Sequence, residues 1–247
     1  MTAPITLITG GTKGIGLEAV KRFAAKGHRV ITCARYKNSW TEVIDANSAL
    51  AEVHFVKADL SSRDDVESLF DCIKSEYGTL SNAINNASPK LESGGTFKEI
   101  EFDRLFSTLT NDLWSHAMCL KSELNLMSEG SCIVNVSSVN GLRPTPHAAM
   151  YSAAKHGLEG LTKSVAIEAL KQGTRVNAVA PGVTWTPRWE EREKDNSNIR
   201  DEVSDIVPSK RFGTPAEIVN AIEWLCSPSS SYVVGHTLVV DGGLSLA

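Results

Sequence analysis

The sequence lacks the features that would set it apart from ordinary globular proteins. Positive charge is not in excess, because 25 Lys and Arg residues face 29 Asp and Glu residues and the net charge is −4. Such a chain offers no basic field to a nucleic acid. Its apolar runs fall short of the roughly 20 residues that span a membrane, and its first residues lack the pattern of a signal peptide. We therefore expect no nucleic acid partner, no membrane partner and a cytoplasmic location.

The chain is also poor in cysteine. Its five cysteines are odd in number, widely spaced, and form no C-x-x-C pair or Cys/His cluster in the sequence. We interpret them as free and mostly buried thiols, since cysteine is among the most buried residue types. The sequence predicts neither a disulfide framework nor a metal site.

No internal repeat and no Gly/Ser-rich linker divides the 247 residues, so we expect a single domain over residues 1–247. What the chain contains is an alternation of short apolar runs and helix-length segments. The apolar runs are Ile5 to Thr9, Arg29 to Cys33, Val53 to Lys57, Leu80 to Ile84, Cys132 to Val136, Arg175 to Ala180 and Thr237 to Val240. The helix-length segments are Gly16 to Lys26, Arg63 to Tyr77, Tyr151 to Leu170 and Pro215 to Leu225. This βαβα rhythm predicts an α/β fold, a doubly wound (Rossmann) parallel sheet with helices on both faces.

Two local patterns add detail to this outline. Ser61, followed by Asp64 and Asp65, is predicted to cap the helix over residues 63–77. Residues 187–210 are polar and charged and follow a strand end, and a structureless stretch that long is usually mobile or functional. We expect a lid over a site at residues 187–210, with a solvated helical insertion as the alternative.

Glycines gather where the first strand meets the first helix. The segment there is Thr9-Gly10-Gly11-Thr12-Lys13-Gly14-Ile15-Gly16. Glycine permits a tight turn and a close approach of the backbone to a pyrophosphate, whose charge then faces the free N–H groups of the helix N-terminus. The spacing of these glycines resembles the single-domain branch of the short-chain dehydrogenase/reductase family, in particular members similar to 3-oxoacyl-carrier-protein reductases.

Further segments resemble the same family in the same order. Asp59-Leu60 resembles its pair beside the adenine, and Asn85-Asn86-Ala87-Ser88 resembles its Asn-Asn-Ala-Gly turn, with serine in place of the last glycine. Pro181-Gly182 resembles its turn beside the nicotinamide. The resemblance implies that the cofactor is bound by Gly10, Thr12, Lys13, Gly14, Ile15, Gly16, Arg35, Asp59, Leu60, Asn86, Ala87, Tyr151, Lys155, Pro181, Gly182, Thr184 and Thr186.

The end of the second strand indicates which dinucleotide is bound. A fold of this kind that prefers NAD carries an acid there for the ribose 2′-hydroxyl, whereas this chain has Ala34-Arg35. Arg35 offers a planar charged fork suited to a phosphate, and Lys13 adds a second positive group. We predict NADP(H); the alternative for Arg35 is a surface arginine with no ligand.

The predicted chemical centre lies at the start of the long helix. Tyr151 and Lys155 are four residues apart and therefore share one helical face. A nearby ammonium favours the phenolate form of a tyrosine, which suits a proton donor in catalysis. Ser138 ends a predicted strand upstream, and the resemblance assigns it to the substrate oxygen, with Ser137 as the near alternative.

A fourth catalytic position is open between two residues. The family often has an asparagine in the preceding helix that holds a water in a proton relay to the lysine. Counting back from Lys121 and Glu123 without a gap gives Asp112, whereas the residue type points to Asn111. An extra residue in the helix, such as a π-bulge, would reconcile the two. We assign Asn111 as the prediction.

Together these patterns predict an NADP(H)-dependent oxidoreductase. It would transfer a hydride between nicotinamide and a ketone or secondary alcohol, with a 3-oxoacyl group as one candidate substrate. The alternative is a catalytically idle NADP(H)-binding regulatory protein on the same fold. The family commonly forms tetramers, so we expect a homo-oligomer, a tetramer or a dimer.

Overall fold

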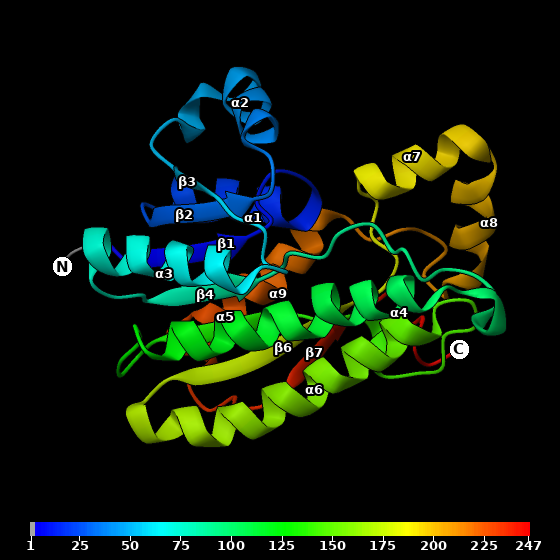
Figure 1. The fold of residues 1–247 in the computed structure, drawn as a ribbon. Helices are drawn as coiled ribbons and strands as arrows, with labels where there is room; N and C mark the ends of the chain where they lie inside the picture. The colour runs from blue at the N-terminus through cyan, green and yellow to red at the C-terminus, as the bar shows by residue number, and fades with distance from the viewer. Residues whose placement is uncertain (1–2) are drawn as a thin grey trace.

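A single parallel sheet organises the chain. The computed structural model describes residues 3–247, and its sheet has seven strands in the order β3-β2-β1-β4-β5-β6-β7 (Figure 1). The strands are β1 Ile5–Thr9, β2 Arg29–Ala34, β3 His54–Lys57, β4 Asn82–Asn85, β5 Cys132–Val136, β6 Arg175–Pro181 and β7 Thr237–Val240. The prediction of a doubly wound parallel sheet is confirmed.

Helices cover both faces of this sheet (Figure 1). They are α1 Gly14–Ala25, α2 Lys37–Ala46, α3 Arg63–Tyr77, α4 Phe102–Leu109, α5 Ser115–Leu124, α6 Ala149–Ala169, α7 Pro187–Asp195, α8 Ile199–Ile206 and α9 Pro215–Cys226. One buried cluster joins α3, α5 and α6 to the sheet, and a second joins α1, α2 and α9 to it. Within residues 3–247, no helix combines the length and the apolarity needed to cross a bilayer.

Two predicted boundaries are wrong for identifiable reasons. The cap of α3 is Ser62, whose hydroxyl accepts from the Asp65 backbone N–H at 3.3 Å. Ser61 instead donates its hydroxyl to Asp59 Oδ1 at 2.8 Å. Strand β4 begins two residues later than expected, since the Leu80 N–H donates to the Leu126 carbonyl, outside the ladder.

Residues 187–210 contain regular structure rather than a structureless stretch. Helices α7 and α8 occupy most of them and bury none of their residues, as expected for the solvated helical alternative. They are attached through aromatic contacts, with the rings of Trp185 and Trp189 lying 5.0 and 5.1 Å from that of Phe212. Figure 1 shows the pair at the right of the view, beyond the carboxyl ends of the strands.

The sheet also fixes where a ligand can bind. Strand β1 pairs with β2 on one side and with β4 on the other, so the strand order reverses there. Open α/β sheets bind ligands at such a reversal, outside the carboxyl ends of the strands. The loops that follow β1, β2, β4, β5 and β6 all meet at that edge.

Candidate functional site

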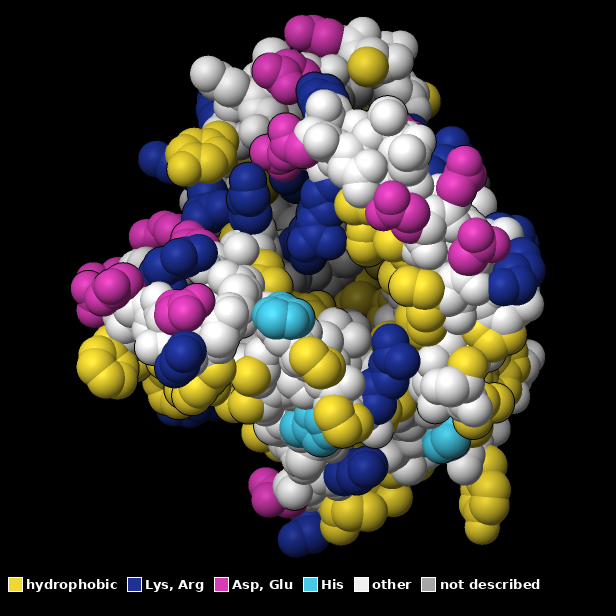
Figure 2. All heavy atoms as spheres, turned by 90° about the vertical axis from the view of Figure 1, so that its right-hand side faces the viewer, with side chains coloured by type: hydrophobic (Ala, Val, Ile, Leu, Met, Phe, Trp, Pro, Cys, Tyr) yellow, Lys and Arg dark blue, Asp and Glu magenta, His cyan; other side chains and the backbone are white. Residues whose placement is uncertain are grey.

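A cleft runs along the carboxyl ends of the strands. Its cavity volume is about 300 Å³, and Figure 2 shows the hollow with Lys and Arg side chains gathered around its mouth. The predicted residues that line it are Gly10, Thr12, Lys13, Gly14, Ile15, Arg35, Asp59, Leu60, Asn86, Ala87, Asn111, Ser138, Tyr151, Lys155, Pro181, Gly182, Thr184 and Thr186. Segments far apart in sequence therefore form one site, while Gly16 lies just behind the lining.

The glycine loop leaves the N-terminus of α1 free to bind an anion. Gly10 and Gly14 have φ of +71° and +57°, which side chains rarely adopt. A Cβ on Gly16 would lie 2.2 Å from the Gly10 carbonyl oxygen. The helix has no side-chain cap and no acid in its first turn, so its first N–H groups face the cleft without a competing carboxylate. The residues present fit a pyrophosphate here.

Two cations stand at the neighbouring end of the cleft. Lys13 and Arg35 line both the main cleft and a second hollow beside it. Within residues 3–247 neither lies within 4.0 Å of a carboxylate. The Arg35 guanidinium is 5.7 Å from the centre of the Tyr36 ring. Two cations without an ion-pair partner at this place fit a 2′-phosphate.

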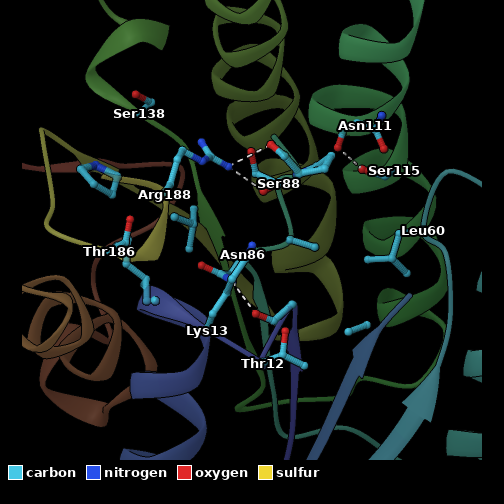
Figure 3. A pocket seen from close by; sticks show the side chains of 18 of the residues that line it. Thr12, Lys13, Leu60, Asn86, Ser88, Asn111, Ser115, Ser138, Thr186 and Arg188 are labelled. Atoms are coloured by element: carbon cyan, nitrogen blue, oxygen red, sulfur yellow. Dashed lines mark hydrogen bonds between the residues drawn. The ribbon is translucent and has the colours of Figure 1, made fainter. Parts of the chain in front are cut away.

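The turn after β4 is tied to the glycine loop. Asn86 Nδ2 donates to the Thr9 and Gly10 carbonyls at 3.0 and 3.3 Å (Figure 3). The backbone N–H groups of Asn86 and Ala87 both donate to Thr9 Oγ1 at 3.0 Å. These contacts hold two walls of the cleft in a fixed relation.

Lys155 is a buried charge at the chemical end. Its side chain is 1% exposed, and Nζ donates to the Val136 carbonyl at 3.3 Å. Nζ also lies 3.5 Å from Asp112 Oδ1 and 5.6 Å from the centre of the Tyr151 ring. A buried ammonium needs a partner, and Asp112 supplies it. The side chain is therefore held beside the tyrosine.

Both candidate serines line the cleft. Ser138 Oγ accepts from the Asn140 N–H at 3.1 Å, which leaves its own proton free to donate to a substrate oxygen. Ser137 Oγ is buried and has no partner among the described residues. Ser138 therefore has the fixed position that a hydrogen-bond donor to substrate requires.

The two candidates for the fourth position face different ways. Residues Thr110–Trp114 form a π-helical turn, the irregularity expected from the sequence. Asn111 lines the cleft, but its amide donates back to Ser107 O at 2.9 Å. Asp112 Oδ1 instead accepts from Ser88 Oγ at 2.7 Å and pairs with Lys155. The catalytic role of Asn111 stays a prediction.

Two buried titratable side chains, those of His116 and Glu123, lie inward of Lys155. Burial and the Lys155 charge lower the pKa of His116 well below its usual range. Burial raises the pKa of Glu123 to about 8, although Asn85 Nδ2 donates to Glu123 Oε2 at 3.0 Å and opposes the rise. The interior next to the site is thus populated by neutral forms of titratable groups.

Sequence reasoning missed one contributor to the site and the contact between two others. Asp112 was a candidate for the fourth position and Ser88 a departure in the turn after β4, and the structure places them in contact. Arg188 gave no signal, because it belongs to a segment treated as a loop, yet its side chain enters the cleft (Figure 3).

Known proteins resemble this chain over its whole length. A family model described as enoyl-(acyl carrier protein) reductase matches residues 10–245. A 3beta-hydroxysteroid dehydrogenase of Mediterraneibacter gnavus is 33% identical and covers 98% of this chain and 94% of its own. Among solved structures, an actinorhodin polyketide ketoreductase variant with NADPH has a TM-score of 0.90 and 30% identity, with 99% and 98% of the two chains covered. ElxO with NADP bound has a TM-score of 0.93 and 28% identity, with both chains covered completely at 100%.

Proposed function

Because the chain belongs to the short-chain dehydrogenase/reductase family, we propose that it is an NADP(H)-dependent oxidoreductase that interconverts a ketone and a secondary alcohol. One observation carries the proposal: Lys155, almost completely buried, stands beside Tyr151 in a cleft whose other end is the glycine loop. Lys155 is also expected to bind the cofactor, so its position beside the Tyr151 ring is what favours proton transfer over binding alone.

The cofactor would lie along the lining residues. The α1 N-terminus would hold the pyrophosphate, Lys13 and Arg35 the 2′-phosphate, and Thr184 and Thr186 the carboxamide. When bound, the nicotinamide supplies or accepts the hydride. The solved neighbours with NADPH and NADP support this choice of cofactor.

The chain's own residues handle the proton and the oxygen. In the reducing direction Tyr151 donates its hydroxyl proton to the substrate oxygen as negative charge develops there. Ser138 donates a hydrogen bond to the same oxygen. Lys155 stabilises the phenolate that remains and is itself held by Asp112 and the Val136 carbonyl. Oxidation of an alcohol follows the reverse course.

A 3-oxoacyl group is the substrate class we propose. The matched family model is described by an acyl carrier protein substrate, and one solved neighbour is a polyketide ketoreductase. Both descriptions concern acyl chains, although the hydroxysteroid relative shows that the same fold also serves rings.

Helices α7 and α8 form the lid of this proposal. The lid is tied across the cleft by the pair Lys90–Glu191 at 3.3 Å.

One face of the protein forms the proposed subunit contact. On this outer surface, Phe102, Phe106 and Trp114 are 87, 70 and 57% exposed. Large exposed aromatic side chains mark an interaction surface, which supports a homo-oligomer, a tetramer or a dimer.

The proposal is tested by Tyr151→Phe. We expect the variant to lose turnover of every ketone in a panel that includes a 3-oxoacyl ester, because it has no proton to donate, while NADPH binding measured by fluorescence is retained. Ser164→Ala alters an exposed hydroxyl on the same helix, far along it from the cleft, and serves as the control. Full activity in Tyr151→Phe would contradict the mechanism, and a wild type that binds NADPH but reduces nothing would favour the regulatory alternative.

A further inference from the structure

Arg188 reaches from the lid to the opposite wall of the cleft. It is the second residue of α7, two residues beyond the cofactor-lining Thr186. Its Nη2 donates to the Ser88 and Pro89 carbonyls, both at 2.9 Å. Figure 3 shows the side chain spanning the space between Thr186 on one side and Ser88 on the other. The guanidinium therefore crosses the channel between the two walls.

The charge of Arg188 is not neutralised by the protein. Among residues 3–247 no carboxylate oxygen lies within 4.0 Å of it, and its two acceptors are neutral carbonyls. The acid one turn along the same helix, Glu191, pairs with Lys90 instead. Nη1 and Nε have no hydrogen-bond partner in the described protein, so three of the five N–H donors of the fork are free.

An arginine in this state is suited to an oxyanion. A guanidinium binds phosphate or carboxylate oxygens through paired N–H groups, and such charge-assisted bonds are about twice as strong as neutral ones. The side chain is half-buried, so water screens such an interaction less than on an open surface. The two carbonyl acceptors hold the fork in place before a ligand arrives.

The position of Arg188 selects the ligand. The first wall of the channel consists of the glycine loop and Thr186, and the second contains Asn86 and Ser88. A dinucleotide that runs from Arg35 to Pro181 passes between these walls, and its pyrophosphate belongs at the α1 N-terminus near Thr186, since Gly14 would contact the Thr186 side chain if it carried a Cβ.

We propose that Arg188 is an oxyanion-binding residue in the roof of the cleft and that its ligand is the pyrophosphate of the bound dinucleotide. This assignment rests on the proposed cofactor but not on turnover. A phosphate or carboxylate on the substrate is the other source of the same chemistry. In either case α7 carries a cation that closes over the ligand's negative charge.

The test compares Arg188→Ala with two variants of the same helix. Arg192→Ala removes a guanidinium whose carbon lies 4.7 Å from the centre of the Trp189 ring and outside the cleft. Glu191→Gln removes the Lys90–Glu191 ion pair, the other contact that holds the lid. We expect Arg188→Ala to raise the Kd for NADPH about tenfold or more in a fluorescence titration. Arg188→Lys should recover part of this loss, and both control variants should stay within about twofold of the wild type. Circular dichroism checks that all variants fold.

Two further measurements distinguish the sources. Adenosine 2′,5′-bisphosphate has no pyrophosphate, so its affinity should be unchanged in Arg188→Ala if the pyrophosphate is the ligand. If NADPH affinity is unchanged but KM rises for keto acids and not for their neutral esters, the oxyanion belongs to the substrate and the anion-binding role stands. If neither quantity changes, or if Arg192→Ala and Glu191→Gln weaken NADPH binding equally, the proposal is overturned. A wild type that binds NADPH without reducing ketones would refute the proposed function alone.

Discussion

At the scale of single residues, the site depends on charges that the fold has removed from water. Lys155 and Asp112 are 1 and 3% exposed, and no other ion pair among the described residues is buried on both sides. A pair of this kind adds little net stability, but removal of one partner leaves an uncompensated charge. The position of Lys155 beside Tyr151 therefore depends on a residue that does not line the cleft.

Asp112→Asn should therefore damage both stability and catalysis. The substitution keeps an oxygen that can accept from Ser88 but removes the charge that compensates Lys155, so we expect a loss of roughly 3 kcal/mol in the free energy of unfolding. We also expect kcat to fall about tenfold or more with little change in KM, because substrate does not contact Asp112. Urea unfolding and steady-state kinetics measure the two effects. Asp103→Asn, on the exposed surface of α4, is the control and should change neither.

Arg35→Ala should change the choice of cofactor. Loss of the guanidinium removes a partner of the 2′-phosphate, so kcat/KM with NADPH should fall about tenfold or more while the value with NADH is retained. Arg29→Ala is a matched control, since Arg29 lies at the other end of β2 and stacks on Tyr77 at 4.5 Å. Equal losses with both cofactors would exclude a specific role for Arg35.

These residues differ in how far the sequence could reveal them. Tyr151, Lys155 and the glycines were predictable because each belongs to a local pattern with a fixed spacing. The Ser88–Asp112 contact joins residues 24 apart, and Arg188 reaches carbonyls 99 and 100 residues away. Contacts of that range depend on how the elements pack, which no local pattern contains.

At the scale of elements, the helices around the cleft follow two sets of rules. Helix α3 spans the predicted residues 63–77 because its apolar periodicity is clear, and Gly78 with φ of +74° follows its end, although its cap is Ser62 and not the predicted Ser61. Helices α7 and α8 bury no residue, and α7 is nearly without apolar residues, so its sequence is hard to distinguish from a loop. Strand β4 has only four residues, and its start is set by a contact with the loop after α5.

The junction of β1 and α1 should not tolerate a side chain. In Gly16→Ala the new Cβ would lie 2.2 Å from the Gly10 carbonyl oxygen and 2.4 Å from Asn86 Nδ2, so the loop must move. We expect a loss of NADPH affinity in fluorescence titrations and a lower melting temperature. Gly160→Ala, in the exposed part of α6 with nothing within 4 Å of its Cβ, is the control. There we expect a gain of about 0.5–1 kcal/mol, because alanine is the better helix former.

At the scale of the whole molecule, several polar side chains lie in the interior between the sheet and its helices. Asn85, Asn135 and Glu123 are all at most 1% exposed, and Asn85 Nδ2 donates to both Glu123 Oε2 and Asn135 Oδ1, which joins β4 to α5 and to β5. The overall topology was predictable from the βαβα rhythm, since parallel sheets buried on both faces have few alternatives. The burial of Glu123 was not, because nothing in the local sequence of α5 distinguishes it from a solvated glutamate.

Glu123 should make the stability of the protein depend on pH. Its pKa is about 8 in the folded protein and near the ordinary 4.5 when unfolded, so unfolding releases a proton between these values and stability falls as pH rises. The lowered pKa of His116 changes stability in the opposite direction, and only below about pH 6.5. The raised pKa of Cys33 changes stability in the same direction as Glu123, but only near and above the ordinary cysteine value of 9.0. From pH 6.5 to 8 we therefore expect a loss of roughly 1–2 kcal/mol that is absent in Glu123→Gln.

Urea unfolding at several pH values measures this difference. The exposed Glu52→Gln variant should retain the full pH dependence of the wild type. A Glu123→Gln protein with the same slope as the wild type would show that the carboxyl group is ionised in the folded state.

The double use of Ser88 has a consequence for the timing of catalysis. Its carbonyl accepts from Arg188 on the lid, while its hydroxyl donates to Asp112, the partner of Lys155. A single residue thus connects the proposed lid to the carboxylate that pairs with Lys155. If α7 and α8 open as the proposed lid, that carbonyl would be released, the loop after β4 would gain freedom to shift Asp112, and the proposed proton donor Tyr151 would lose the fixed ammonium beside it. The enzyme would then be competent only while its cleft is closed.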